Sequence, residues 1–426
     1  MTELEFLPSE LRAGVTAQEL IADPAAWINR RVETVRMLTH EETRRQVSID
    51  FTLSVAQEEG LSTEEGVVVP ISVLTKEPRR NFDLRDESGA AVPVLGKGSN
   101  GRLAHIAALS AALDPLAAAE ASDDAIELLA GDIGHIVSGA PAEAGAALEQ
   151  IAAGAGSGNR LRGLVWEDEI AREMLQTLAG NYVLFAVLPP GGPRRRILKY
   201  SYGDALEALE VSFREQWRPS WLWLRATSPD RGRFFVQCPA ADRAASFHAE
   251  IEVPSELRIE AAVLYDLEND LELSVVDSNV NRASLYANQS MDPHGDVTAY
   301  VEVVAERQGK PSLAVGAAAI VSILLWVGVL SHLDSRNPGS AVSILLAGAA
   351  LFSGLLAVSG EHPLVSHLFS ASRRWLSLVA VAALAASAAL AMQAPSERPV
   401  GVWLVAAVIA SVAAVRLGWA ATRSPS

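Results

Sequence analysis

The stretch "LAVGAAAIVSILLWVGVLSHL", residues 313–333, decides the architecture of this chain. It contains no Asp, Glu, Lys or Arg, and about 20 helical residues suffice to cross the hydrocarbon core of a bilayer. Three similar stretches follow at residues 340–360, 375–393 and 400–420, with prolines between them and Arg416 as their one charged residue. The sequence therefore predicts an all-α domain of four transmembrane helices over residues 313–420.

Basic residues near the ends of these spans predict the orientation. The side shared by the two termini holds most of them, namely Arg307, Lys310, Arg373, Arg374, Arg416 and Arg423, whereas the other side holds Arg336 and Arg398. The positive-inside rule then places both termini in the cytoplasm, and the start of the chain has no secretory-signal pattern. We expect a multi-pass protein of the inner (plasma) membrane. Residues 1–305 form its cytosolic part, residues 306–312 a juxtamembrane linker and residues 421–426 a cytosolic tail.

The overall composition excludes several function classes. The net charge is −16, and the acidic excess lies before residue 311, because the rest of the chain has more arginines than acids. Such a surface repels phosphate backbones, so we expect no nucleic acid among the partners. The single cysteine, Cys238, excludes an intrachain disulfide and a cysteine-based zinc cage, and we expect it to be a small buried residue.

The sequence pattern predicts a β-rich cytosolic part with a helical insertion at about residues 100–180. Alternating β-branched residues predict strands in "TRRQVSIDFTLSV" (43–55) and "GVVVPISVLTK" (66–76), and "NFDLRDESGAAVPVL" (81–95) predicts a hairpin. Further turn-punctuated strands follow residue 180. The predicted fold class is therefore α+β, a cytosolic antiparallel β-sandwich-like domain followed by the transmembrane helices.

Gly96, Gly98 and Gly101 match the dinucleotide-binding pattern G-x-G-x-x-G. That site needs parallel strands on both sides of the loop and its helix. Here an antiparallel hairpin precedes the glycines, and only helical sequence follows them. We therefore interpret the loop as a turn into a helix and expect no cofactor.

The segments "RRQVSIDFTL" (44–53) and "EPRRNFDLRDESGAAVPVLGKGSNGRLA" (77–104), followed by four C-terminal spans, resemble a group of uncharacterised actinobacterial membrane proteins. The resemblance covers most of the chain. It implies neither an activity nor any catalytic residue.

Two polar segments are candidate sites. Alternation in "FDLRDE" turns Asp83 and Arg85 outward, and with Asp86 and Glu87 they form either a charged outer strand face or a contact site for a partner or small ligand. In the membrane domain, Glu361, His362 and His367 lie in the loop between the second and third spans. They are either an interfacial sensor of protons or metal, or part of an amphipathic turn.

Small residues recur every four positions along two spans. They are Ala382 and Ala386 in the third span, and Ala406, Ala410 and Ala414 in the fourth. Helix faces formed by small residues let two helix backbones approach closely in lipid. We expect these spans to pack together, within one chain or between chains of a homo-oligomer.

The leading functional hypothesis is a non-enzymatic membrane protein. Its cytosolic domain would recognise an unidentified cytosolic protein or small ligand, as in a signalling, stress or defence effector, with the lipid bilayer as its other partner. The alternatives are a membrane-anchored enzyme and an oligomeric small-solute channel. The spans carry no ionisable residue at mid-depth, which disfavours a transporter.

Overall fold

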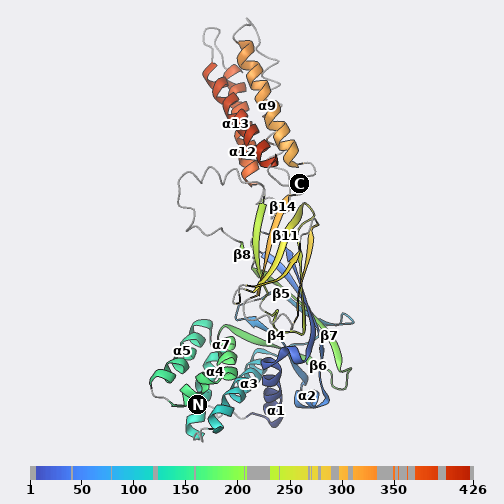
Figure 1. The fold of residues 1–426 in the computed structure, drawn as a ribbon, viewed down its shortest axis with the longest axis vertical. Coiled ribbons are helices and arrows are strands. Elements are labelled where there is room, and N and C mark those ends of the chain that lie inside the picture. The colour runs from blue at the N-terminus through green and yellow to red at the C-terminus, as the bar shows by residue number, and fades with distance from the viewer. Residues whose placement is uncertain are drawn as a thin grey trace.

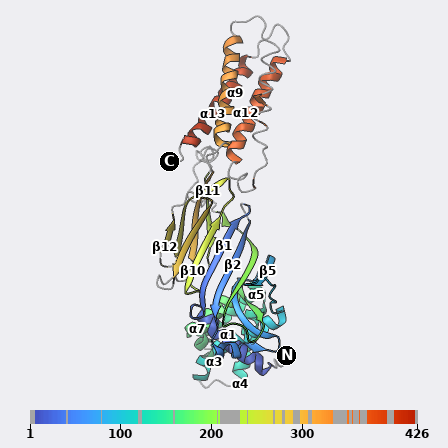
Figure 2. The same ribbon diagram turned by 90° about the vertical axis from the view of Figure 1, so that its right-hand side faces the viewer.

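A computed structural model gives the structure of the chain. It describes residues 6–39, 42–77, 79–118, 123–157, 160–205, 207–208, 231–238, 240–266, 269, 271–276, 280–288, 297–305, 310–332, 349–350, 354, 362, 370–391 and 400–422. These residues form three units along one long axis: an N-terminal lobe of helices and strands, a β-sandwich and a helical bundle (Figure 1). The view turned by 90° shows the same order, with strands running from the lobe into the sandwich (Figure 2).

A six-stranded sheet, sheet A, connects the lobe and the sandwich. Its strand order is β13-β10-β1-β2-β7-β5, in which β1 and β10 are parallel and the other neighbours antiparallel. The strands are β1 (Ile28–Met37), β2 (Glu42–Thr52), β5 (Arg80–Asp86), β7 (Arg195–Ala205), β10 (Ser246–Glu252) and β13 (Arg282–Asn288). Sheet A therefore joins segments that lie as far apart in the chain as residues 28 and 288.

The sandwich forms where β13, β10 and β1 face a second, five-stranded sheet. That sheet has the order β12-β11-β14-β9-β8 and consists of β8 (Glu207–Ala208), β9 (Arg231–Gln237), β11 (Leu257–Asp266), β12 (Leu271–Val276) and β14 (Val297–Ala305). Alternation explains the packing: β10 buries Phe247, Ala249 and Ile251 and turns the residues between them outward. This core closes the sandwich without any helix.

The lobe packs helices on a third sheet with the order β3-β4-β6. The strands are β3 (Ser62–Thr63), β4 (Gly66–Thr75) and β6 (Asn181–Leu188), and the helices are α1 (Pro8–Ala22), a 3-10 turn η1 (Pro24–Ala26), α2 (Val55–Gly60), α3 (Lys97–Ala118), α4 (Asp123–Ser138), α5 (Pro141–Ser157), α6 (Arg160–Glu167) and α7 (Glu169–Gly180). Helix α7 shows why they form. Asp168 caps it by accepting from Ala171 N at 2.9 Å, and Met174, Leu175 and Leu178 form its buried stripe.

The predicted mixture of helices and strands is confirmed, and α3 to α7 occupy the predicted insertion at about 100–180. The expectation of a purely antiparallel sandwich is wrong, because β1 pairs in parallel with β10. Hairpin signals in the sequence report neighbouring strands only, and these two strands are far apart in the chain.

The bundle contains α9 (Lys310–His332), α12 (Ser370–Ala391) and α13 (Val400–Thr422). Two stretches, Leu313–Leu330 in α9 and Gly401–Trp419 in α13, are long and apolar enough to cross a membrane. Helix α12 coincides with the predicted third span. Most of the predicted second span lies outside the described residues.

Two close approaches hold α9 against α13. A Cβ added at Gly328 would lie 1.9 Å from the ring of Trp403, so only glycine fits there beside the indole. The hydroxyls of Ser322 and Ser411 lie 2.8 Å apart, and Trp326 Nε1 donates to Ser411 Oγ at 2.9 Å. Polar contacts between helices of this kind stabilise packing in an apolar surrounding.

The glycines of the lobe allow a matched test of the packing. A Cβ at Gly14 in α1 would lie 2.3 Å from Ile106 Cγ2 in α3, whereas a Cβ at Gly101 meets no atom within 4 Å. We predict that Gly101→Ala raises the free energy of unfolding by up to about 1 kcal/mol, because alanine favours the helix. Gly14→Ala should lower it by about 1–3 kcal/mol through overpacking. Thermal unfolding of the two variants beside the wild type checks this; equal midpoints would contradict the α1–α3 contact.

Candidate functional site

A cavity of about 440 Å³ lies where the lobe core and the sandwich core meet on sheet A. We call it the junction cavity. Its walls come from α1, β1, β2, β4, β7, β9 and the loop at 240–243, and they contain four arginines, Arg31, Arg45, Arg79 and Arg243. No surface loop alone builds this site, because its side chains stand on strands from both parts of the molecule.

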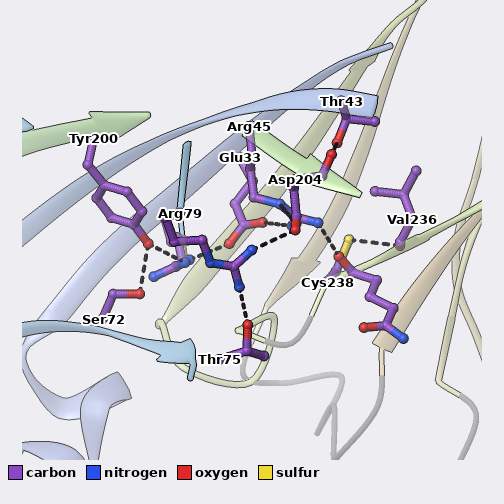
Figure 3. A network of polar contacts seen from close by, with 12 residues as sticks. Glu33, Thr43, Arg45, Ser72, Thr75, Arg79, Tyr200, Asp204, Val236 and Cys238 are labelled. Carbon is purple, nitrogen blue, oxygen red and sulfur yellow. Dashed lines mark hydrogen bonds and ion pairs between the residues drawn. The ribbon is translucent and has the colours of Figure 1, made fainter. Parts of the chain in front are cut away.

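Glu33 on β1 is the centre of the charged network in this cavity (Figure 3). Its carboxylate accepts from Arg31 Nε at 2.7 Å and from Arg45 Nη1 at 2.6 Å. The Glu33 side chain is 1% exposed, and the two arginine side chains are 5% and 7% exposed. The carboxylate therefore bridges two guanidinium groups out of contact with water.

Asp204 on β7 is the second carboxylate of the network. Its carboxylate lies 3.4 Å from Arg45 Nε and 2.7 Å from Arg79 Nη1. Arg79 also donates to Thr75 Oγ1, and its guanidinium carbon lies 4.8 Å from the centre of the Tyr202 ring. Arg45 Nη2 reaches across to the backbone carbonyl of Gln237 on β9 at 2.9 Å, which connects sheet A with the opposite sheet.

Tyr200 extends the network toward the lobe. Its hydroxyl accepts from Arg31 Nη2 at 2.9 Å and lies 2.8 Å from Ser72 Oγ on β4. Burial raises the pKa of the neighbouring Tyr202 above its ordinary value. Tyr202 therefore supplies a neutral hydroxyl and a ring face to the cavity, not a negative charge.

The protonation states follow from burial and from the guanidinium groups. Burial alone would raise the pKa of Glu33, but Arg31 and Arg45 outweigh it and hold the pKa below the ordinary range. Burial raises the pKa of Cys238 to about 12, and its Sγ lies 3.6 Å from the Val236 carbonyl oxygen. The structure thus places Cys238 as a buried, protonated thiol, as expected from the sequence.

Arg243 differs from the other three arginines. It lines the cavity from the loop between β9 and β10, which is anchored by Ala245 N donating to Ile28 O at 2.9 Å. Within the described residues, no carboxylate makes a hydrogen bond or ion pair with its guanidinium. Burial lowers the pKa of Arg243; Asp242 opposes that shift and Arg31 adds to it.

The cavity offers the fixed positive charges of its four arginines and the hydrogen bonds that their guanidinium groups donate. Arginine stays protonated at every physiological pH, so these groups bind and orient anions and do not relay protons. Among the described residues, no three side chains of His, Cys, Asp or Glu gather as a metal ion requires. The geometry favours binding of a small molecule over acid–base chemistry.

The "FDLRDE" residues lie outside the junction cavity. Arg85 Nε donates to Asp83 at 2.7 Å with both side chains about half exposed, and Asp86 accepts from the backbone nitrogens of Ser88 and Ala90 at 2.9 Å each. The turn at residues 87–89 ends in Gly89 with φ +87°, where glycine is needed. Asp83, Arg85 and Asp86 are thus occupied with hairpin contacts, and Glu87 is exposed in the turn.

The glycine pattern is the start of a helix. Helix α3 begins at Lys97, Val94 bridges antiparallel to Ala186 of β6, and the next described elements after α3 are helices. The two-strand frame of a dinucleotide site is absent from this described region. Gly96 directly precedes this helix, whereas Gly98 and Gly101 lie inside its first turns, so the helix begins earlier than the interpretation of all three glycines as a turn assumed.

Of the predicted sensor loop, Glu361 and His367 lie outside the described residues. His362 lines a second, more open hollow beside Arg36, Glu252 and Arg282 at the bundle end of the sandwich. The interfacial role of this loop stays a prediction.

The alanines singled out in the sequence lie inside the bundle. Ala382, Ala386, Ala406 and Ala410 are buried in its core, and Ala414 packs against that core. Helices α12 and α13 pack on each other, and α13 also packs on α9. The sequence interpretation missed this last contact, because the glycine and serines that form it are not a regular stripe of small residues.

Sequence reasoning also missed the junction cavity, although the pattern holds a signal for it. Arg31 and Glu33 alternate in phase with the buried Val35 and Met37, and Arg45 alternates in phase with Val47. Charged residues on the core side of a strand must find partners or a ligand. That register predicts a buried polar site.

Comparison with protein-family models gives no match for this chain, and no curated protein matches it either. The resemblance to actinobacterial membrane proteins therefore stays a prediction, and function has to be argued from the site.

We predict that Glu33→Gln lowers the free energy of unfolding by about 3–5 kcal/mol, because it leaves two buried guanidinium groups without their shared counter-charge. Asp83→Asn, at the exposed pair with Arg85, should cost no more than about 1 kcal/mol. Thermal unfolding of the full-length protein at pH 7 compares them; equal costs would contradict the buried network.

The effect of Glu33 should also depend on pH. Because its folded-state pKa is lowered from 4.5, its contribution is fully present above that value and is lost as the pH falls through the folded-state pKa. The difference between wild type and Glu33→Gln should therefore shrink on acidification. A difference that grows toward low pH would show that Glu33 is protonated in the folded protein.

Proposed function

We propose that this chain is a membrane-anchored recognition protein that binds a small ligand in the junction cavity. The observation that carries the proposal is a cavity of about 440 Å³ lined by four arginines at the boundary of two cores. This volume lies within the roughly 300–1,000 Å³ typical of small-molecule sites. Apolar walls with a few directed polar groups are the usual composition of such sites.

Recognition fits the site better than catalysis. Three of the four guanidinium groups are held in place by Glu33 and Asp204, so the donors are preorganised. The Cys238 thiol beside the network is buried and protonated, which leaves it a poor nucleophile. These properties support tight, oriented binding. Neither the guanidinium groups nor the Cys238 thiol has a pKa near neutral pH, as a proton-transfer group needs.

The position of the cavity suggests how binding is passed on. β1 contributes Ile28 to the lobe core and Val35 and Met37 to the sandwich core, so one strand traverses both. A ligand that contacts both walls favours the arrangement in which they are closed on it. In our proposal a cytosolic protein partner responds to that arrangement.

The bundle serves in this proposal as a four-span anchor in the inner membrane, with both termini in the cytoplasm. Its outer surface supports this, because large apolar side chains such as Ile323, Leu330, Val381 and Val415 are at least half exposed. Exposed apolar faces of this extent suit contact with lipid tails. The basic residues at the span ends agree with the cytoplasmic orientation.

The orientation can be tested by thiol labelling, and the chain offers a low background because its single cysteine is buried. Cysteines introduced at Asn337 and Ser396 should react with a membrane-impermeant maleimide on intact cells, and one at Ser424 should react only after permeabilisation. The wild-type protein is the control. The reverse labelling pattern would overturn the orientation and the cytosolic location of the cavity.

Occupancy of the cavity can be tested by filling it. Ala240 lines the cavity and is 7% exposed, so Ala240→Phe should occupy part of its space. Mass spectrometry of small molecules released from the full-length protein should detect a compound that the variant has lost. Ala140→Phe, at an exposed turn, should keep it. Identical small-molecule content in all three proteins would count against a ligand at this site.

A further inference from the structure

We propose that the ligand of the junction cavity is a small organic anion, whose phosphate or carboxylate group binds Arg243 beside Arg31. This inference rests on the proposed function and names the chemical class that the site takes. It comes from the charge balance of the cavity, the composition of its walls and its place in the molecule.

The charge balance leaves one guanidinium unmatched. Arg31, Arg45 and Arg79 share two largely buried carboxylates, those of Glu33 and Asp204. Among the other described lining residues the one acid is Glu77, which is exposed at the rim. Arg243 therefore contributes a positive charge that no lining carboxylate pairs with, beside an arginine that repels it.

The Arg243 side chain is partly buried, and a partly buried guanidinium without a counter-charge in its own cavity is unfavourable unless something compensates it. Asp242, adjacent in the chain, attracts Arg243 but is itself exposed and does not line the cavity. An anion inside the cavity would supply the missing negative charge. Its oxygens would accept hydrogen bonds from the N–H groups of Arg243, in the forked geometry that arginine offers to phosphate and carboxylate. The Nε atoms of Arg45 and Arg79 are buried and make no hydrogen bond, although Arg45 Nε lies within ion-pair distance of Asp204, so they are further donors of the same network.

The remaining walls require an organic body on the anion. Apolar lining residues come from α1, β4 and β9, among them Leu20, Ile71, Phe235 and Val236. Trp27 also lines the cavity, but its Nε1 already donates to Leu20 O at 2.9 Å, so it offers a ring face and no donor. Inorganic phosphate alone would leave these apolar walls without a partner, and its affinity should be low.

The location distinguishes a soluble anion from a lipid headgroup. The junction cavity lies where the cores of the lobe and the sandwich meet. The sandwich lies between the lobe and the bundle that we assign to the membrane (Figures 1 and 2). A lipid whose tails remain in the bilayer would have to leave it to reach Arg243. The ligand is therefore a soluble molecule of the compartment that holds the lobe.

The test uses the full-length protein in a neutral detergent and a matched series of probes. Phenyl phosphate and hexanoate carry an anion on an apolar body, hexanol and hexylamine are the neutral and cationic counterparts, and inorganic phosphate lacks the body. Vesicles containing phosphatidylglycerol provide the lipid arm. Calorimetric titration and the shift in unfolding temperature are measured for wild type, Arg243→Gln, Arg243→Lys and Arg12→Gln, the last on the exposed face of α1.

Phenyl phosphate or hexanoate should bind wild type and Arg12→Gln equally, and Arg243→Gln should weaken that binding at least tenfold. Arg243→Lys should retain part of it, because lysine keeps the charge without the fork. Without ligand, Arg243→Gln should unfold at the same temperature as wild type or higher, since it removes an unmatched charge. An arginine with a purely structural role would instead lower the unfolding temperature when replaced.

Each contrary result has its own meaning. Equal binding of hexanol and hexanoate would overturn the anion assignment and leave a ligand-binding cavity in place. Binding confined to anionic vesicles would overturn the soluble source. If no probe binds and Arg243→Gln only destabilises the protein, the anion site is excluded. Retention of a released compound by Ala240→Phe would then reject the proposed function separately.

Discussion

The carboxylate of Glu33, held between Arg31 and Arg45, is the interaction on which the lobe and the sandwich depend. The lobe core and the sandwich core meet at this point of β1, where an apolar pair would have continued the packing. Burying three charges is favourable only while every partner is present, so the network fixes how β1, β2 and β7 align. Through Arg45 and the Gln237 carbonyl it also fixes the distance to the opposite sheet.

This arrangement makes the lobe and the sandwich one mechanical unit in spite of their different architectures. A flexible linker would let the two parts move independently, but sheet A passes through both and carries side chains into each core. Binding energy released in the junction cavity therefore acts on the packing of two cores at once. The bundle, by contrast, has a core of its own, which is built from α9, α12 and α13.

Local patterns predicted much of this fold, and long-range pairing accounts for what they missed. The amphipathic stripe of α7, the Gly89 hairpin and the apolar stretches of α9 and α13 each satisfy a rule that operates within about 20 residues. The parallel β1–β10 pair and the contact of Gly328 with Trp403 join distant segments, which one sequence does not reveal. The sequence-based prediction of the site was incomplete for a similar reason. A run of charges such as the one at Asp83 is visible in the sequence itself, whereas Arg31 and Glu33 are recognised as buried only from their register with the apolar residues of β1.

The parallel pairing of β1 with β10 also constrains the order of synthesis. Thr34 and Glu250, which face each other across this pair, are 216 residues apart in the chain. The lobe core comes almost entirely from residues that emerge earlier, so the lobe can collapse while one edge of β1 still lacks its neighbour. An unpaired edge of this kind is open to pairing with other chains. The buried charges on β1 make such mispairing unfavourable, and thereby protect the nascent protein until β10 arrives.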